Sequence, residues 1–209
     1  ETFDDSGANI TLNDASSTFG TITAQASNGA GNVTSDGDIQ ITENADLTID
    51  TIDTLGDVTL TSAGAIIDGD DTFDDISADA VVLSAVNGIG NTDALETAIN
   101  SIQASTTNGN ISLTNDVSGL LTIAGNVTAG GDVNISNASP LTVSADVSGS
   151  TIALTASDTA AAGDDMTISA VSITSTGDLT LNVGDDLSIA GGASLSAGTN
   201  NITINLDGS

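Results

Sequence analysis

Short runs of alternating apolar and polar residues recur along the chain, and glycine, asparagine or aspartate separates one run from the next. The stretch 109–135 contains three such runs, at 111–113, 120–123 and 133–135. Alternation between turn residues is typical of short, half-buried β-strands. The same order of strand, turn and strand recurs at 37–60 and 177–204. The pattern therefore predicts a β-protein built from repeats.

The spacing of similar segments sets the size of the repeat. Ser6, Ser77 and Ser148 open such segments and are 71 residues apart. Inside the repeats, the glycines before the first and last runs are 19, 22 and 21 residues apart, close to the roughly 20 residues of one solenoid turn. We predict an all-β fold, a parallel β-helix (β-solenoid) of about nine to eleven turns. It forms one elongated segment of three tandem units, at about 1–70, 71–141 and 142–209.

Composition favours the solenoid over two alternatives. Phe3, Phe19 and Phe73 are the only aromatic residues, whereas a compact globule usually relies on large side chains. Tandem β-sandwich modules remain an alternative, although about 70 residues is small for a sandwich without disulfides. Disorder is the other alternative, and regular apolar alternation argues against it. Pro140, the single proline, is expected at a corner.

The segment 92–106 is the one place where a helix competes with a strand. Thr92 or Asp93 could cap a helix with Glu96 in a capping box. The segments at equivalent positions in the other repeats have strand patterns, so we predict a strand here too, with a corner near Asn100 and Ser101.

The acidic net charge of the chain disfavours several classes of binding partner. The chain has 29 acidic residues and no lysine, arginine or histidine. Salt bridges between side chains and lysine isopeptide crosslinks are therefore impossible, and nucleic acid and anionic membrane surfaces are poor partners. No signal peptide or apolar membrane-spanning run is visible. An acidic chain without trypsin sites suits an extracellular protein in salty water.

The residue inventory also argues against catalysis. Without cysteine, histidine or lysine, the usual activated nucleophiles are missing. Paired carboxylates could hydrolyse glycosides on a β-helix, but the basic residues and the Trp and Tyr platforms that bind sugars are absent. We predict a non-catalytic protein without a cofactor.

Adjacent aspartates are the one candidate for metal binding. Oxygen ligands at turns suit Ca²⁺, although neither the EF-hand loop nor the nonapeptide Ca²⁺ repeat is present. Solvated acidic corners are therefore the favoured interpretation. The candidate for a weak Ca²⁺ site consists of Asp68, Asp70, Asp71, Asp74 and Asp75.

Two further polar motifs have structural explanations. Glycosylation sequons occur at Asn9, Asn32, Asn110, Asn126, Asn134, Asn137 and Asn201, but the same pattern arises when a strand starts after an Asn corner. Thr-x-Thr motifs, as at Thr21 and Thr23, are found in ice-binding solenoids. Here they do not recur at a fixed place in every turn, and Thr is also simply a good strand former.

The phrase SAGAIID at 62–68, the run at 87–115 and the recurring G-[DN]-[IVL]-x-[IL] resemble the repeats of filamentous-haemagglutinin-like giant bacterial surface adhesins. The resemblance covers essentially the whole chain and rests on degenerate motifs. It implies a right-handed parallel β-helix shaft, exported to the bacterial cell surface, that spaces adhesive modules. The secretion-domain motifs of such proteins are missing, which we expect of an interior shaft segment.

We therefore expect a structural shaft, spacer or filament body. The alternatives are a Ca²⁺-stabilised module that binds carbohydrate or ice and a donor-strand-assembled filament subunit. Expected partners are flanking repeats of the same protein or identical subunits end to end. The expected partner outside the protein itself is a host or neighbouring cell surface, or a polysaccharide.

Overall fold

A computed structural model describes residues 9–14, 16–26, 36–69, 73–116, 119–157 and 163–207. Asp70, Asp71 and Asn32 lie outside these residues. The described strands are β1 Ile10–Leu12, β2 Thr21–Gln25, β3 Ile39–Glu43, β4 Leu47–Asp53, β5 Val58–Ser62, β6 Ile66–Asp68, β7 Ile76–Ala85, β8 Leu95–Thr106, β9 Ile111–Asn115, β10 Leu121–Thr128, β11 Val133–Asn137, β12 Leu141–Val143, β13 Val147–Gly149, β14 Ile152–Ala156, β15 Met166–Ile168, β16 Ser172–Ser175, β17 Leu179–Val183, β18 Leu187–Ile189, β19 Ser194–Ser196 and β20 Ile202–Leu206.

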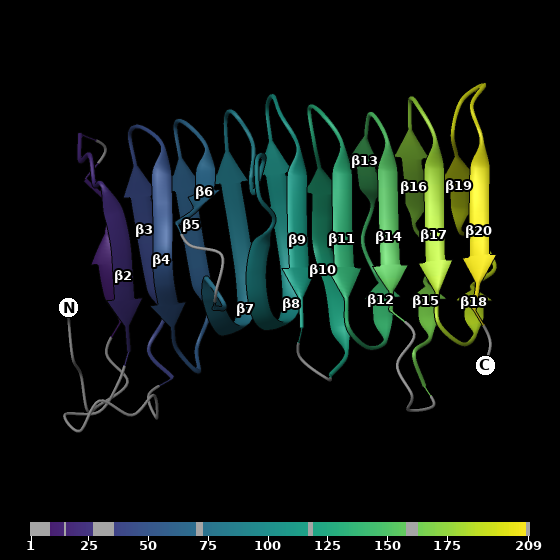
Figure 1. Cartoon of the computed structure of the whole chain (residues 1–209), viewed down its shortest axis with the longest axis horizontal. Coiled ribbons are helices and arrows are strands. Elements are labelled where there is room, and N and C mark those ends of the chain that lie inside the picture. Colours follow the sequence, from purple (N-terminus) through teal and green to yellow (C-terminus); the bar gives the residue numbers. More distant parts are fainter. Residues whose placement is uncertain are drawn as a thin grey trace.

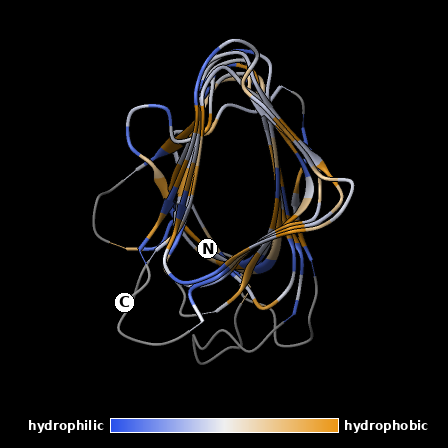
Figure 2. Cartoon of the chain, turned by 90° about the vertical axis from the view of Figure 1, so that its right-hand side faces the viewer, coloured by the Kyte–Doolittle hydropathy of each residue, from blue (hydrophilic) through white to orange (hydrophobic). Residues whose placement is uncertain are grey.

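The strands stack in sequence order along the long axis of the molecule (Figure 1). Every strand pairing between described residues is parallel, for example β11 with β9 on one side and with β14 on the other. Seen along the axis, the successive turns follow nearly the same outline (Figure 2). These pairings confirm the all-β solenoid and exclude antiparallel sandwich modules within the described chain.

Stacked apolar side chains form the core. In a strand such as β9, the side chains of Ile111 and Leu113 point inward and that of Ser112, between them, points outward, as the period of two requires. One ladder contains nine residues in register, all buried or half-buried except Leu12: Leu12, Ile41, Leu60, Leu83, Ala104, Val127, Val147, Ile173 and Leu195. Each fully buried Ile or Leu contributes about 1.5–3 kcal/mol.

The number of turns is lower than predicted. The nine residues of this ladder are separated by eight steps, and Leu12 and Leu195 are 183 residues apart, which is about 23 residues per turn. The solenoid therefore has about seven to eight turns rather than nine to eleven. The prediction assumed about 20 residues per turn. Some connections between strands are longer than this assumption allows, so the same chain makes fewer turns.

The spacing of 71 residues corresponds to three turns at its first occurrence. Ile10 and Val81 lie in one ladder, joined through Ile39 and Val58. Ile152, the matching residue of the third unit, pairs instead with Val133 and Leu179 in another ladder. Similar sequence segments thus occupy different sides of the coil.

The segment 92–106 contains a strand, as predicted. In β8 the buried positions alternate up to Ile99, shift at Asn100 and Ser101, and alternate again from Ile102. The strand therefore bends around a corner without ending. The Asn100 amide donates a hydrogen bond of 2.8 Å to Asp79, which lies at the same bend in β7.

Polar side chains inside the corners satisfy the backbone there. The hydroxyl of Ser62 donates to the carbonyls of Ala45 and Ala65, at 2.6 and 2.9 Å, and Thr106 donates to the Gly109 carbonyl at 2.9 Å. Gly109 has φ of +78°, and a Cβ on it would lie 2.1 Å from the carbonyl oxygen of Asn87. The chain can turn so tightly here because the residue is glycine.

Two buried amides bridge three turns of the core. Asn115 is 1% exposed and Asn137 is 0% exposed. The Asn115 amide donates to the side-chain oxygen of Asn137 at 2.7 Å, and its own oxygen accepts from the Ile99 N–H at 2.9 Å. Asn137 in turn donates to carbonyls near Pro140, which lies at a corner as predicted.

Candidate functional site

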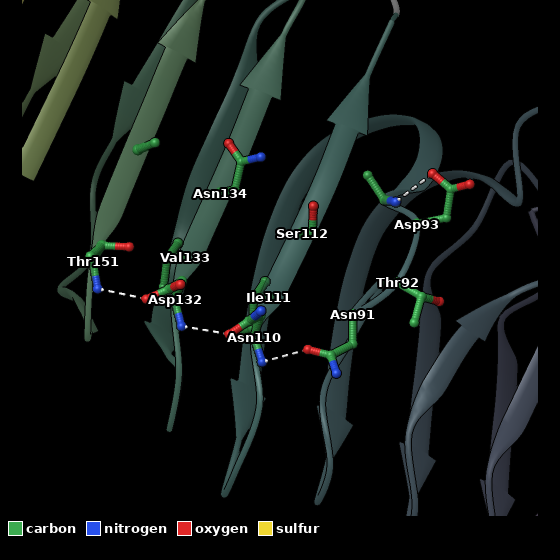
Figure 3. Close-up of a pocket in the computed structure, with 13 residues that line it drawn as sticks. Asn91, Thr92, Asp93, Asn110, Ile111, Ser112, Asp132, Val133, Asn134 and Thr151 are labelled. Atoms are coloured by element: carbon green, nitrogen blue, oxygen red, sulfur yellow. Dashed lines mark hydrogen bonds between the residues drawn. The ribbon is translucent and has the colours of Figure 1, made fainter.

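Asparagine and aspartate side chains at the corners join each turn to the next. Figure 3 shows one such row, in which the N–H groups of Asn110, Asp132 and Thr151 donate to the side-chain oxygens of Asn91, Asn110 and Asp132, at 3.1, 2.9 and 2.9 Å. The same bond occurs at six other corners, where the acceptors are Asn9, Asp38, Asp46, Asp146, Asp165 and Asp178. In four copies of the G-[DN]-[IVL] motif the second residue accepts from the following turn in this way, namely Asp38, Asn110, Asp132 and Asp178.

Asp132 provides a direct test of these corner bonds. Asp132→Ala is expected to lower the free energy of unfolding by about 1 kcal/mol, because the Thr151 N–H loses its acceptor. Asp132→Asn removes the same charge but keeps an oxygen, so its stability should stay close to that of the parent. Urea unfolding monitored by circular dichroism measures both. Equal destabilisation by the two variants would contradict a hydrogen-bonding role for Asp132.

Four of the sequon asparagines occupy structural positions, whereas Asn126 and Asn134 have exposed side chains. Asn9, Asn110 and Asn201 directly precede β1, β9 and β20, as expected of strands that begin after an Asn corner. Asn137 is fully buried and its amide is hydrogen-bonded. In the folded chain this side chain is inaccessible to a glycosylating enzyme.

A shallow groove of about 340 Å³ lies beside the row of corner bonds in Figure 3. It runs between the loop at 91–94 and the outer face of β9, β11 and β14. Its lining consists of amide, hydroxyl and carboxylate groups with small apolar residues, and several of these oxygens already accept hydrogen bonds. Such a lining offers hydrogen-bonding contacts to a hydroxyl-rich ligand.

A row of eight hydroxyl side chains, joined by seven steps from turn to turn, follows the outside of the coil. It consists of Thr42, Thr61, Ser84, Ser105, Thr128, Ser148, Thr174 and Ser196. The neighbouring row two residues earlier is irregular, since Gln40, Thr59, Val82 and Gln103 follow one another there. One hydroxyl row is therefore regular, whereas the double Thr-x-Thr row does not form.

Three carboxylates form the one group of possible metal ligands found among the described residues. Oxygen atoms of Asp68, Asp75 and Glu96 all lie within 4.8 Å of one another. Asp68 ends β6, Asp75 directly precedes β7, and Glu96 lies in β8 on the following turn. The sequence prediction named Asp68 and Asp75. It missed Glu96. It also named Asp74, which is not part of the group.

Burial and repulsion shift the ionisation of these acids. Asp75 is 0% exposed, and burial together with the nearby Asp68 carboxylate raises the pKa of Asp75 to about 8. One opposing contact is the Glu96 N–H, which donates to Asp75 Oδ2 at 3.0 Å. The pKa of Asp74 is also raised, first by burial and then by Asp116 and Asp53. Since the chain has no basic side chain, only protons or cations from solution can neutralise these groups.

The chain matches no known protein-family model, no curated protein and no solved structure. Among the residues that the structure describes, none belongs to a helix long and apolar enough to cross a membrane.

Proposed function

We propose that this chain is a non-catalytic shaft or spacer segment of a secreted bacterial surface adhesin. The observation that carries the proposal is the unbroken parallel ladder from Leu12 to Leu195, which continues through eight steps without a change of fold. In such a coil each added turn lengthens the molecule by about 4.8 Å, so length is the property that repetition provides.

The outer surface supports an extracellular spacer. Its strands present hydroxyl and amide groups, and the net charge of −29 keeps the segment soluble and repels other acidic surfaces. The inventory of side chains offers neither an activated nucleophile nor a basic residue for phosphate. These features favour spacing over chemistry.

The last strand supports end-to-end continuation. Ile202, Ile204 and Leu206 of β20 are 45%, 43% and 59% exposed. In β17, the residues in register with them, Leu179, Leu181 and Val183, are buried. We propose that flanking repeats of the same protein, or an identical subunit, cover this strand by adding a parallel neighbour.

The regular hydroxyl row favours a second candidate, a surface that binds ice or carbohydrate. Eight consecutive Ser or Thr side chains would present a repeat of about 4.8 Å. The irregular neighbouring row, with Val82 between Thr59 and Gln103, makes this candidate the weaker one.

Spacer function requires a fixed distance between the ends. Because the chain has no cysteine, Asn13→Cys and Thr199→Cys can each carry one spin label. Asn13 directly follows β1 and Thr199 lies three residues beyond β19, so their separation along the axis of the coil should be about 38 Å, or eight steps of ~4.8 Å. Double electron–electron resonance should show one narrow distance distribution near that value. The distribution should be the same at about 0.05 M and about 1 M NaCl.

A broad distance distribution would contradict a stiff spacer. Saturable binding of the unlabelled chain to members of a glycan array would instead favour the second candidate. A parallel measurement on the chain unfolded in urea gives the broad reference distribution for comparison.

A further inference from the structure

We propose that Asp68, Asp75 and Glu96 bind one Ca²⁺ ion that joins two consecutive turns of the coil. Their carboxylate oxygens lie within 4.8 Å of one another. Two oxygens bound to the same Ca²⁺ at 2.3–2.6 Å can be at most about 5 Å apart. The three groups are therefore already spaced as ligands of one ion.

Asp75 provides the second observation that points to a ligand. Its side chain is 0% exposed. Oδ2 accepts the Glu96 N–H at 3.0 Å, whereas the buried Oδ1 has no hydrogen-bond partner. A buried carboxylate oxygen without a donor is costly; a proton shared with Asp68 removes that cost while Asp75 is protonated, and a bound cation would remove it once Asp75 is ionised.

The strand register explains why the acids meet. Asp68 pairs with Ile49, a residue that is fully buried, so a carboxylate stands in register with an apolar core residue. Asp75 lies at the other end of the connection between β6 and β7, and its N–H donates to the Glu96 carbonyl at 2.8 Å. An ion here would hold both ends of that connection against β8.

The chemistry favours Ca²⁺ over other cations. All three ligands are hard oxygen donors, which suits Ca²⁺ and offers nothing to metals that prefer nitrogen or sulfur. Three carboxylates and no basic side chain leave local negative charge for a divalent ion to neutralise. Sites of extracellular modules bind Ca²⁺ at about 10⁻⁴–10⁻³ M, and we expect that range. The inference does not depend on the shaft proposal.

Nuclear magnetic resonance of the ¹⁵N-labelled chain tests the site with Ca²⁺ alone. At constant ionic strength, the amides of Ile76 and Glu96 should shift along one saturable curve, because they adjoin the proposed ligands. Asp75→Asn and Glu96→Gln should each weaken binding at least about tenfold. Glu96 is only half-buried, so its variant keeps the test valid if Asp75→Asn does not fold.

Asp186→Asn is the matched control, because it removes one charge from an exposed corner outside the cluster. It should bind Ca²⁺ like the parent chain. The proposal is overturned if the shifts do not saturate, if NaCl of equal ionic strength reproduces them, or if all three variants bind equally. Each of those results would indicate general screening of an acidic surface.

Discussion

Replacing Asn137 with alanine is expected to lower the free energy of unfolding by about 3 kcal/mol. The two N–H groups of the Asn137 amide are shared among the carbonyls of Gly119, Ser139 and Pro140, whose oxygens lie 3.1, 2.9 and 2.7 Å from the amide nitrogen. Its oxygen accepts from Asn115, which is itself buried. The substitution removes the acceptor of the buried Asn115 amide and the donor to the half-buried carbonyls of Gly119 and Ser139, and each polar group that loses its partner costs up to about 1–3 kcal/mol.

Asn134→Ala is the matched control, because Asn134 lies in the same strand, β11, with an exposed side chain. Its effect on stability should stay within about 0.5 kcal/mol. The urea midpoint and the slope of the transition measure both variants. If Asn137→Ala unfolded at the same urea concentration as Asn134→Ala, the buried amide network would not contribute to stability.

Raising the pH from about 4 to about 8 is expected to destabilise the fold by a few kcal/mol. The pKa of Asp75 in the folded chain is raised from 3.8 to about 8. Below pH 4, Asp75 is protonated in both states and contributes no pH dependence. Between pH 4 and 8, the unfolded chain releases this proton while the folded chain retains it, so stability falls by at most ~1.4 kcal/mol per pH unit. Above pH 8 the loss is complete.

The range from pH 5.5 to 8 isolates this effect, since ordinary carboxylates have already ionised there. The carboxylates facing Asp75 are Asp68 and Glu96, and neighbouring Asp74 faces Asp116 and Asp53. Urea unfolding with a chelator present should therefore show a downward slope. Asp75→Asn should flatten that slope and Asp186→Asn should keep it. If the free energy of unfolding of the parent chain stayed constant across this pH range, the raised pKa of Asp75 would be refuted.

The alternation of apolar and polar residues was sufficient to predict the strands. Ile111 and Leu113 both point inward because alternate side chains of a strand lie on the same face, and the apolar face of the strand is the buried one. Even the bend at Asn100 was predictable, since the apolar residues change phase there. The number of turns was not, because the length of a connection depends on how far a loop projects from the coil, and apolar periodicity carries no information on that.

The acidic cluster shows a different limit. Asp68 and Asp75 are close in sequence, so their pairing could be predicted from adjacency. Glu96 joins them only through the register of β7 with β8, and no short motif encodes that register. Likewise, the G-[DN]-[IVL] motif was recognisable in the sequence, but the partner of its polar side chain became clear only when Asn110 and Asp132 were seen on successive turns.

Nine of the corner bonds point the same way along the coil, whereas the Asp185 side chain accepts from Gly163 and Asp164 of the preceding turn. In all nine, the side-chain acceptor belongs to the earlier turn and the N–H donor to the later one, as with Asp38 and Asp57 or Asp178 and Asn201. A chain that emerges with its N-terminus first therefore meets, at each of these corners, an acceptor already held in place by the preceding turn. Vectorial folding of this kind needs no distant contact, because each new turn is templated by the one before it.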